Sequence, residues 1–213
     1  MSVLKADILL FTNEKLKLAD EIADILDEIN IVLKDLSRRA KWPDLYRSNV
    51  TADQTTLSSG DSPISFPTGL RVLDKIVIND GTNDGRPLKE ITFQKSLERR
   101  EDESSANYDE PKEYAQRGKK WYPDPIPDGA YTAKYWFWRY HPATDAEKTG
   151  DDDDILFGDE FDIIIKYGVC AEIARTHKRT DYIALWEPRY EREVAKILPE
   201  EDKDKTLAKY SDL

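Results

Sequence analysis

Apolar residues recur at steps of three and four over residues 13–39, a spacing that places them on one face of an α-helix. Arg38 and Arg39 suit the negative end of the helix dipole, and Pro43 cannot continue the helix. We therefore expect a single amphipathic helix from Asn13 to Arg39. Its apolar stripe consists of Leu18, Ile22, Ile25, Ile29, Val32 and Leu36.

The pattern then changes to short β-branched and aromatic runs separated by turn residues. Arg71–Ile78 predicts a strand, and a dense run of Asn, Asp and Gly joins it to Leu88–Phe93, so we expect a hairpin. A second hairpin is expected between Glu113–Tyr122 and Tyr131–Tyr140. Aromatic residues fall on both faces of the last strand, which favours a central strand or one whose outer face meets a partner.

Two polar stretches lie around these strands. Residues 42–67 are rich in Ser, Thr, Asp and Gly and predict a long connection. Residues 97–107 are densely charged and predict either a short helix or an exposed loop.

Helical spacing returns near Phe161 and continues to about Thr176. A further helix begins at a cap formed by Thr180 or Asp181. Because Pro188 lies inside it, either this helix kinks there or a new helix starts with Pro188 in its first turn. The apolar positions of this last pattern are Ile183, Trp186, Tyr190, Val194 and Ile197.

Together these patterns predict an α+β fold. We expect a helical bundle built from the N- and C-terminal helices, an inserted antiparallel β-sheet lobe and an extended C-terminal tail. The 213 residues are enough for one domain with such an insertion. The expected boundaries are 13–42 and 159–198 for the bundle, 64–140 for the lobe and 199–213 for the tail.

Composition narrows the function classes. Lys and Arg number 32 against 43 Asp and Glu, so the formal charge is −11 and a tight grip on DNA phosphates is disfavoured. An acidic protein is instead suited to lie beside DNA that slides past. The single cysteine excludes a disulfide within the chain. No apolar run approaches the ~20 residues that span a bilayer, so we expect no membrane partner. Residues 1–10 have neither the apolar core nor the cleavage site of a signal peptide, so we expect no export signal.

Candidate catalytic and metal-binding residues do not form a set. The Asp151–Asp154 run could bind Ca²⁺, but it lacks the spacing of an EF-hand loop, so a solvated acidic loop is favoured. His141 and His177 are far apart and are expected to be structural, and Cys170 lies in an apolar helix and is expected to be buried. No pair among the abundant carboxylates stands out for a glycosidase. We therefore expect no enzyme, no cofactor and no metal.

The aromatic strand at residues 131–140 offers one further hypothesis. Its rings could stack on the bases of single-stranded nucleic acid if a basic groove lay beside them. Packing in the core of a small sheet is the favoured alternative. The basic residues of this local patch are Lys119, Lys120, Lys134 and Arg139.

Three runs of residues carry a resemblance to a known family. The first is residues 66–74, FPTGLRVLD. The second comprises residues 111–114, PKEY, followed by WYPDP at 121–125 and DGAYT at 128–132. The third is Tyr167-Gly168 with DYIALW at 181–186 and Tyr190. In this order they resemble the head-to-tail adaptor proteins of tailed bacteriophages, also called connector or head-completion proteins, over roughly residues 13–200.

The resemblance implies a structural virion protein that forms a ring in the neck, between portal and tail, usually with about twelve copies around a channel. Genomic DNA would pass through the channel without specific binding. The implied partners are the portal protein, a downstream tail or neck protein and further copies of the same chain, assembled in the host cytoplasm. The C-terminal segment of such proteins reaches onto the portal, which here implies anchors at Leu207, Tyr210 and Leu213.

Other functions stay open at this point. The chain could be another neck or tail ring protein, such as a tail terminator or a tail-completion protein. From a different class, it could be an accessory protein that binds single-stranded nucleic acid or degrades cell walls.

Overall fold

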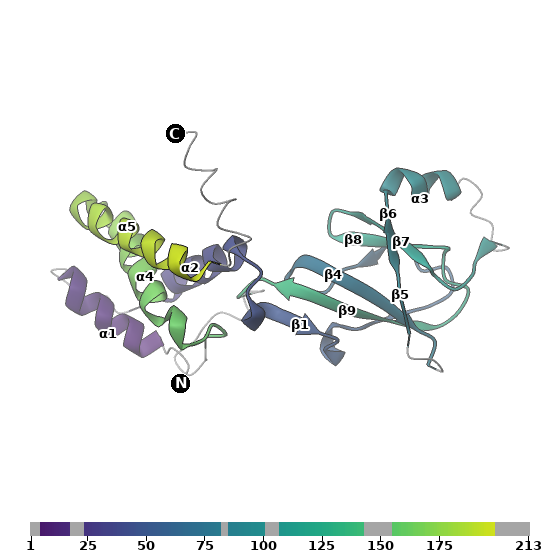
Figure 1. Cartoon of the computed structure of the whole chain (residues 1–213), viewed down its shortest axis with the longest axis horizontal. Coiled ribbons are helices and arrows are strands. Elements are labelled where there is room, and N and C mark those ends of the chain that lie inside the picture. Colours follow the sequence, from purple (N-terminus) through teal and green to yellow (C-terminus); the bar gives the residue numbers. More distant parts are fainter. Residues whose placement is uncertain (1–4, 18–23, 82–84, 101–106, 143–154, 199–213) are drawn as a thin grey trace. The chain divides into compact units, whose positions relative to one another are not determined.

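The computed structural model describes residues 5–17, 24–81, 85–100, 107–142 and 155–198. Its contacts divide the chain into two compact units (Figure 1). Residues 1–45 and 140–213 contribute to the first, which we call the helical unit. Residues 46–139 make up the second, which we call the β unit. Each is described below by itself.

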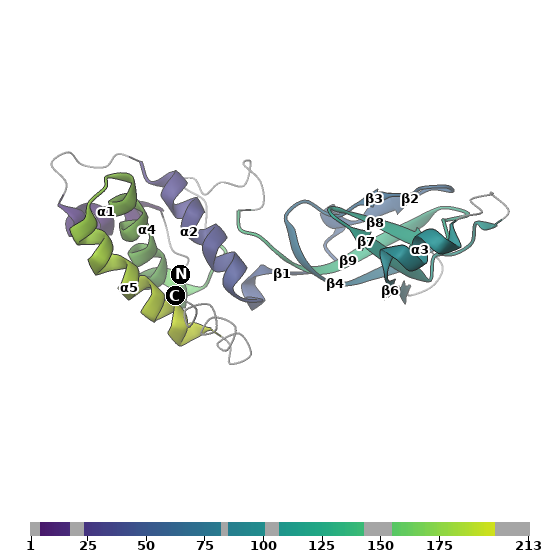
Figure 2. The same cartoon turned by 90° about the horizontal axis from the view of Figure 1, so that it is seen from above.

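One helix organises the helical unit. Helix α4 packs against α1, α2 and α5, so it lies at the centre of the bundle (Figure 2). The bounds are α1 Lys5–Leu16, α2 Leu26–Arg39, α4 Asp162–Thr176 and α5 Thr180–Ile197. The buried residues of α4 are Ile164, Ile165, Gly168, Val169, Cys170, Ala171, Ile173 and Ala174.

The first helical pattern is divided into two helices, so the prediction of one helix from Asn13 to Arg39 is wrong. Helix α1 ends at Leu16, and Lys17 has a φ of 46°, in the left-handed region that a continuing helix cannot use. The Asp24 carboxylate accepts a hydrogen bond from the Leu26 N–H (3.0 Å), so it satisfies a backbone donor at the start of α2. The predicted end at Arg39 is confirmed, whereas the predicted stripe positions Leu18 and Ile22 lie outside the described residues.

The two C-terminal helical patterns agree better with the structure. Helix α4 covers the predicted segment up to Thr176, after a short 3₁₀ turn at Asp159–Phe161. Helix α5 runs from Thr180 through Pro188 to Ile197, so the alternative of a new helix starting at Pro188 is wrong.

A glycine sets the spacing of three helices. A Cβ atom on Gly168 would lie 2.7 Å from Val32 Cγ1 and 3.0 Å from Tyr190 Cε2. Contacts this short are repulsive, so α2 and α5 approach α4 closely only because position 168 has no side chain.

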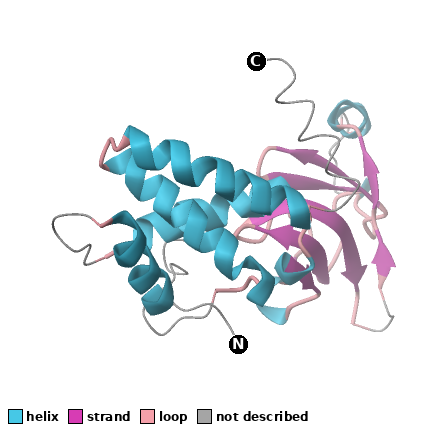
Figure 3. Ribbon diagram, turned by 60° about the vertical axis from the view of Figure 1, so that its left-hand side comes forward, coloured by secondary structure: helices cyan, strands magenta, loops and turns pink. Residues whose placement is uncertain are grey.

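The β unit contains two sheets (Figure 3). In the first, β9 lies between β4 on one side and β1 and β2 on the other, and β4 also pairs with β5. The predicted central position of the aromatic strand is therefore confirmed. The bounds are β1 Tyr46–Ser48, β2 Thr55–Leu57, β4 Leu70–Asn79, β5 Arg86–Pro87 and β9 Tyr131–Arg139.

The second sheet has the order β3-β8-β7-β6 and includes one parallel pair, β6 with β7. The side chains between the sheets include Trp121, whose Nε1–H donates to the Tyr135 hydroxyl (3.2 Å). The bounds are β3 Ile64–Ser65, β6 Lys89–Ile91, β7 Glu113–Arg117 and β8 Lys120–Asp124, and the short helix α3 is Phe93–Arg99. The α+β class is confirmed, with two sheets where one antiparallel sheet was expected.

Both predicted hairpins differ from the observed pairing. Strand β7 turns back into β8 at Gly118, whose φ of 62° suits glycine, so the predicted strand Glu113–Tyr122 is itself the hairpin. Its predicted partner pairs with β4, β1 and β2. In the first predicted hairpin, β4 pairs with the short β5 and not with β6, which belongs to the second sheet.

The polar stretches also contain regular structure. Residues 42–67 include β1, β2 and β3, which pair with longer strands despite their polar sequence. The short-helix alternative for residues 97–107 is correct only for their start, because α3 ends at Arg99 and residues 101–106 lie outside the description.

The β unit begins and ends at neighbouring strands. Tyr46, its first residue, pairs with Trp138 next to its last residue. A lobe whose ends lie side by side can be inserted between two helices of a bundle at little cost. That the lobe and the bundle fold independently stays a prediction.

We expect Gly168→Ala to destabilise the helical unit. Alanine favours a helix over glycine by about 1 kcal/mol, but overpacking against Val32 and Tyr190 costs about 1–3 kcal/mol, so a net loss of about 1 kcal/mol is predicted. Chemical denaturation followed by circular dichroism measures it. Gly129→Ala is the control, because a Cβ there meets nothing within 4 Å. Equal or higher stability of the Gly168 variant would show that the missing side chain does not set the spacing of α2, α4 and α5.

Candidate functional site

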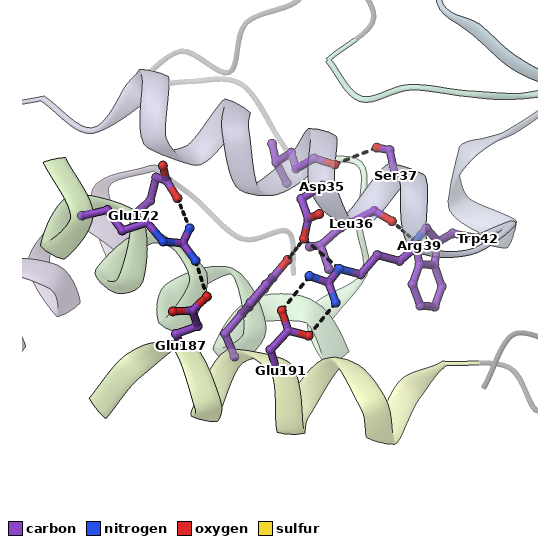
Figure 4. A network of polar contacts seen from close by, with 11 residues as sticks. Asp35, Leu36, Ser37, Arg39, Trp42, Glu172, Glu187 and Glu191 are labelled. Carbon is purple, nitrogen blue, oxygen red and sulfur yellow. Dashed lines mark hydrogen bonds and ion pairs between the residues drawn. The ribbon is translucent and has the colours of Figure 1, made fainter. Parts of the chain in front are cut away.

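A groove of about 450 Å³ runs between α2, α4 and α5 on the helical unit. Figure 4 shows a network of polar contacts that includes the lining residues Asp35, Arg39, Glu172, Glu187 and Glu191. Charged residues dominate its lining, with one well-exposed apolar side chain, Ile31, at 50% exposure. The lining residues are Ile31, Val32, Asp35, Arg38, Arg39, Gly168, Ala171, Glu172, Arg175, Glu187, Tyr190 and Glu191.

Arg39 ties α2 to α5 across one part of this groove. Its guanidinium donates to both carboxylate oxygens of Glu191, at 2.6 and 2.7 Å, and its Nε–H donates to Asp35 at 2.8 Å (Figure 4). The Tyr190 hydroxyl donates to the same Asp35 oxygen at 2.7 Å. A bidentate arginine–carboxylate pair fixes orientation as well as distance, so these contacts set how α5 lies on α2.

The charge states in this cluster follow from its surroundings. Burial alone would lower the pKa of Arg39, but its hydrogen bonds to the Glu191 carboxylate and the charges of Asp35 and Glu191 raise this pKa overall, so the guanidinium stays charged. Burial, followed by the Asp35 charge, raises the pKa of Tyr190 well above its usual value. The tyrosine therefore stays protonated and keeps donating to Asp35.

A second ion-pair cluster joins α4 to α5. Arg175 donates to Glu172 at 2.5 Å and to Glu187 at 2.6 Å. Its side chain is 45% exposed, so this cluster contributes less to stability than the Arg39 cluster.

The arrangement suits contact with another protein better than it suits chemistry. Ion-paired arginines and an exposed isoleucine beside a groove are features of interaction surfaces. No group of three or more His, Cys, Asp or Glu side chains that could hold a metal ion occurs in the part of the chain that the structure describes.

The residues singled out for chemistry in the sequence are scattered. His141 is buried. Its backbone N–H donates to Ser37 Oγ (3.1 Å), and its ring Nε2 accepts from the Leu156 backbone N–H (3.3 Å). His177 caps the C-terminal end of α4 and is exposed. Cys170 is buried as expected, and burial raises the pKa of its thiol to about 12, which disfavours the reactive thiolate.

The basic residues near the aromatic strand belong to different sheets. Lys119 and Lys120 are exposed at the β7–β8 turn, whereas Lys134 and Arg139 lie on β9 of the other sheet. Arg139 is buried, so it is not part of an open basic groove.

The aromatic side chains of β9 divide between its two faces. Tyr135 and Phe137 are buried in the core. Trp136 and Trp138 are half-buried on the other face and are covered in part by Lys75 and Tyr46. Packing in the core therefore accounts for the aromatic residues on one face of β9 only.

The partner-binding residues expected from the resemblance, Leu207, Tyr210 and Leu213, lie outside the described residues, as does the Asp151–Asp154 run. Sequence reasoning missed the groove. The i, i+4 spacings of Asp35 with Arg39 and of Glu187 with Glu191 were visible, but only the fold shows that α2 and α5 are neighbours.

We expect Arg39→Lys to destabilise the protein by about 1–2 kcal/mol, because an ammonium cannot reproduce the two parallel hydrogen bonds to Glu191 or the further bond to Asp35. Urea denaturation measures the change. Arg192→Lys, in an ion pair whose arginine side chain is 66% exposed, is the control and should leave the midpoint unchanged. Equal midpoints for both variants would show that the Arg39 cluster does not hold α2 on α5.

Comparison with known proteins identifies the family. The family model of the SU10 adaptor protein matches residues 2–210, nearly the whole chain. A search of curated proteins finds no match. None of the helices among the described residues has both the length and the apolar character needed to cross a membrane. The match confirms the resemblance to head-to-tail adaptors of tailed phages: the chain belongs to the SU10 adaptor protein family.

Proposed function

We propose that this phage adaptor protein forms a ring in the virion neck, between the portal and the tail, around a channel for the genome. The observation that carries the proposal is the family match over residues 2–210. A ring of about twelve copies needs two different surfaces on each copy and no catalytic centre. The groove on the helical unit supplies one surface of the kind that such a ring requires.

The charge of the chain supports passage of DNA without specific binding. A formal charge of −11 repels phosphates, so a channel built from such chains holds the genome loosely. The ring would assemble in the host cytoplasm, with the portal protein on one side and a tail or neck protein on the other.

We assign portal binding to the C-terminal tail, residues 199–213. In its sequence three apolar residues, Leu207, Tyr210 and Leu213, stand among charged and small ones. A short segment with a few anchors is typical of chains that order on binding a partner. In this proposal the tail belongs to the helical unit, and the β unit, residues 46–139, is the lobe inserted into that unit.

Removal of residues 199–213 is expected to abolish binding to the portal while the rest of the chain still folds. A finer variant combines Leu207→Ala, Tyr210→Ala and Leu213→Ala. Its matched control combines Asp202→Ala, Asp204→Ala and Thr206→Ala. Co-sedimentation with portal rings of the same phage, followed by negative-stain imaging, measures binding, and circular dichroism confirms folding. Full binding by the truncated chain would contradict the assignment of the tail. No ring layer from the unaltered chain would contradict the adaptor role.

A further inference from the structure

Helix α1 presents an acidic stripe with an apolar centre to solvent. Asp7, Leu10 and Glu14 follow the i, i+3, i+7 spacing of one helix face, and all three are exposed. Leu10 is 71% exposed, more than any other large apolar side chain in the described part of the chain. Glu14 also pairs with Lys15 at 2.6 Å, an exposed contact that solvent weakens. We call these residues the α1 stripe.

Helix α2 presents a stripe of the same spacing and opposite charge. Ile31, Lys34 and Arg38 are exposed at i, i+3 and i+7, and Ile31 and Arg38 also line the groove. We call these residues the α2 stripe. Asp27, one turn before Ile31 on this face of α2, is acidic. The part of α2 whose charge is opposite to that of the α1 stripe therefore begins at Ile31.

The two stripes do not cover each other within one chain, because the residues of both are exposed in the same structure. Leu10 lies between the two acidic side chains of the α1 stripe, and Ile31 is followed by the two basic side chains of the α2 stripe. Burying Leu10 against Ile31 removes apolar surface from water, and the surrounding charges then select the partner and the register.

We propose that the α1 stripe of one copy packs on the α2 stripe of the next copy, beside the groove between α2, α4 and α5. This inference rests on the ring proposed above and names the contact between its copies. The contact joins two different surfaces, so it repeats from copy to copy and does not stop at a pair. The Arg39 and Arg175 clusters keep α4 and α5 in place behind the α2 stripe and so preform the surface that receives α1.

Charge reversal tests the proposal. The first variant combines Asp7→Lys with Glu14→Lys, and the second combines Lys34→Glu with Arg38→Glu. Each alone opposes like charges at every contact, so we expect neither to form rings with portal rings present. Mixed in equal amounts, the two variants have complementary contacts in alternation, so assembly should return. Lys119→Glu with Lys120→Glu, on the exposed β7–β8 turn, is the control and should assemble normally.

Cysteine cross-linking tests the register independently of charge. Leu10→Cys and Ile31→Cys are made in separate chains, with Cys170 left in place because it is buried. Oxidation of assembled rings with copper phenanthroline should link the two chains in a mixture and should link neither variant to itself. Links within a single variant at the same rate would overturn the proposal.

The outcomes separate this inference from the proposed function. Rings that form equally well from the unaltered chain, from each reversed variant and from their mixture overturn the contact but leave the adaptor role standing. If the unaltered chain forms no ring with portal rings present, the adaptor role fails and the contact fails with it. Loss in both reversed variants with recovery in the mixture supports both. Circular dichroism of each variant shows that lost assembly is not lost folding.

Discussion

The close approach of three helices at Gly168 is the constraint on which the helical unit depends. Helix α4 buries residues on nearly every side, so other helices must surround it, and α2 and α5 can pack this tightly only where α4 has no side chain. The apolar core supplies the driving force for this arrangement. The groove above it is a consequence, because helices that meet at Gly168 leave a polar space between their outer faces.

The ion pairs beside this crossing have a different role from the core. Arg39 is largely buried, so the attraction of Glu191 and Asp35 is offset by the loss of water around all three groups. The ion pairs instead fix the relative orientation of α2 and α5, because the planar guanidinium can donate to both Glu191 oxygens in one geometry only. A surface that repeats identically around a ring benefits from such fixed geometry. In the proposed contact between copies, the charges of the α1 and α2 stripes are exposed. Such charges contribute to the choice of partner more than to the strength of binding.

The fold could be predicted from the sequence where periodicity was long and unambiguous. The pattern around α4 and α5 gave two helices close to their observed bounds, and the aromatics on both faces of β9 gave its central position. The break between α1 and α2 could not be predicted, because the apolar spacing of the sequence continues past Lys17. The left-handed φ of Lys17, which ends the helix, leaves no mark on that spacing. Strand pairing failed for a related reason. Gly118 turns the chain inside what reads as one strand, and the parallel partner of β6 lies beyond α3. The groove could not be predicted from the sequence, because its charged residues come from three helices that only the fold brings together.

We propose that this adaptor works as a ring whose copies meet through the helical unit. A cryo-electron microscopy map of the chain assembled on portal rings tests it most directly. The account predicts a ring layer in which α1 of each copy lies on α2 of the next, with Leu10 beside Ile31. A ring layer in which the Leu10 face of α1 stays exposed to solvent, or one joined only through the β units, would contradict it.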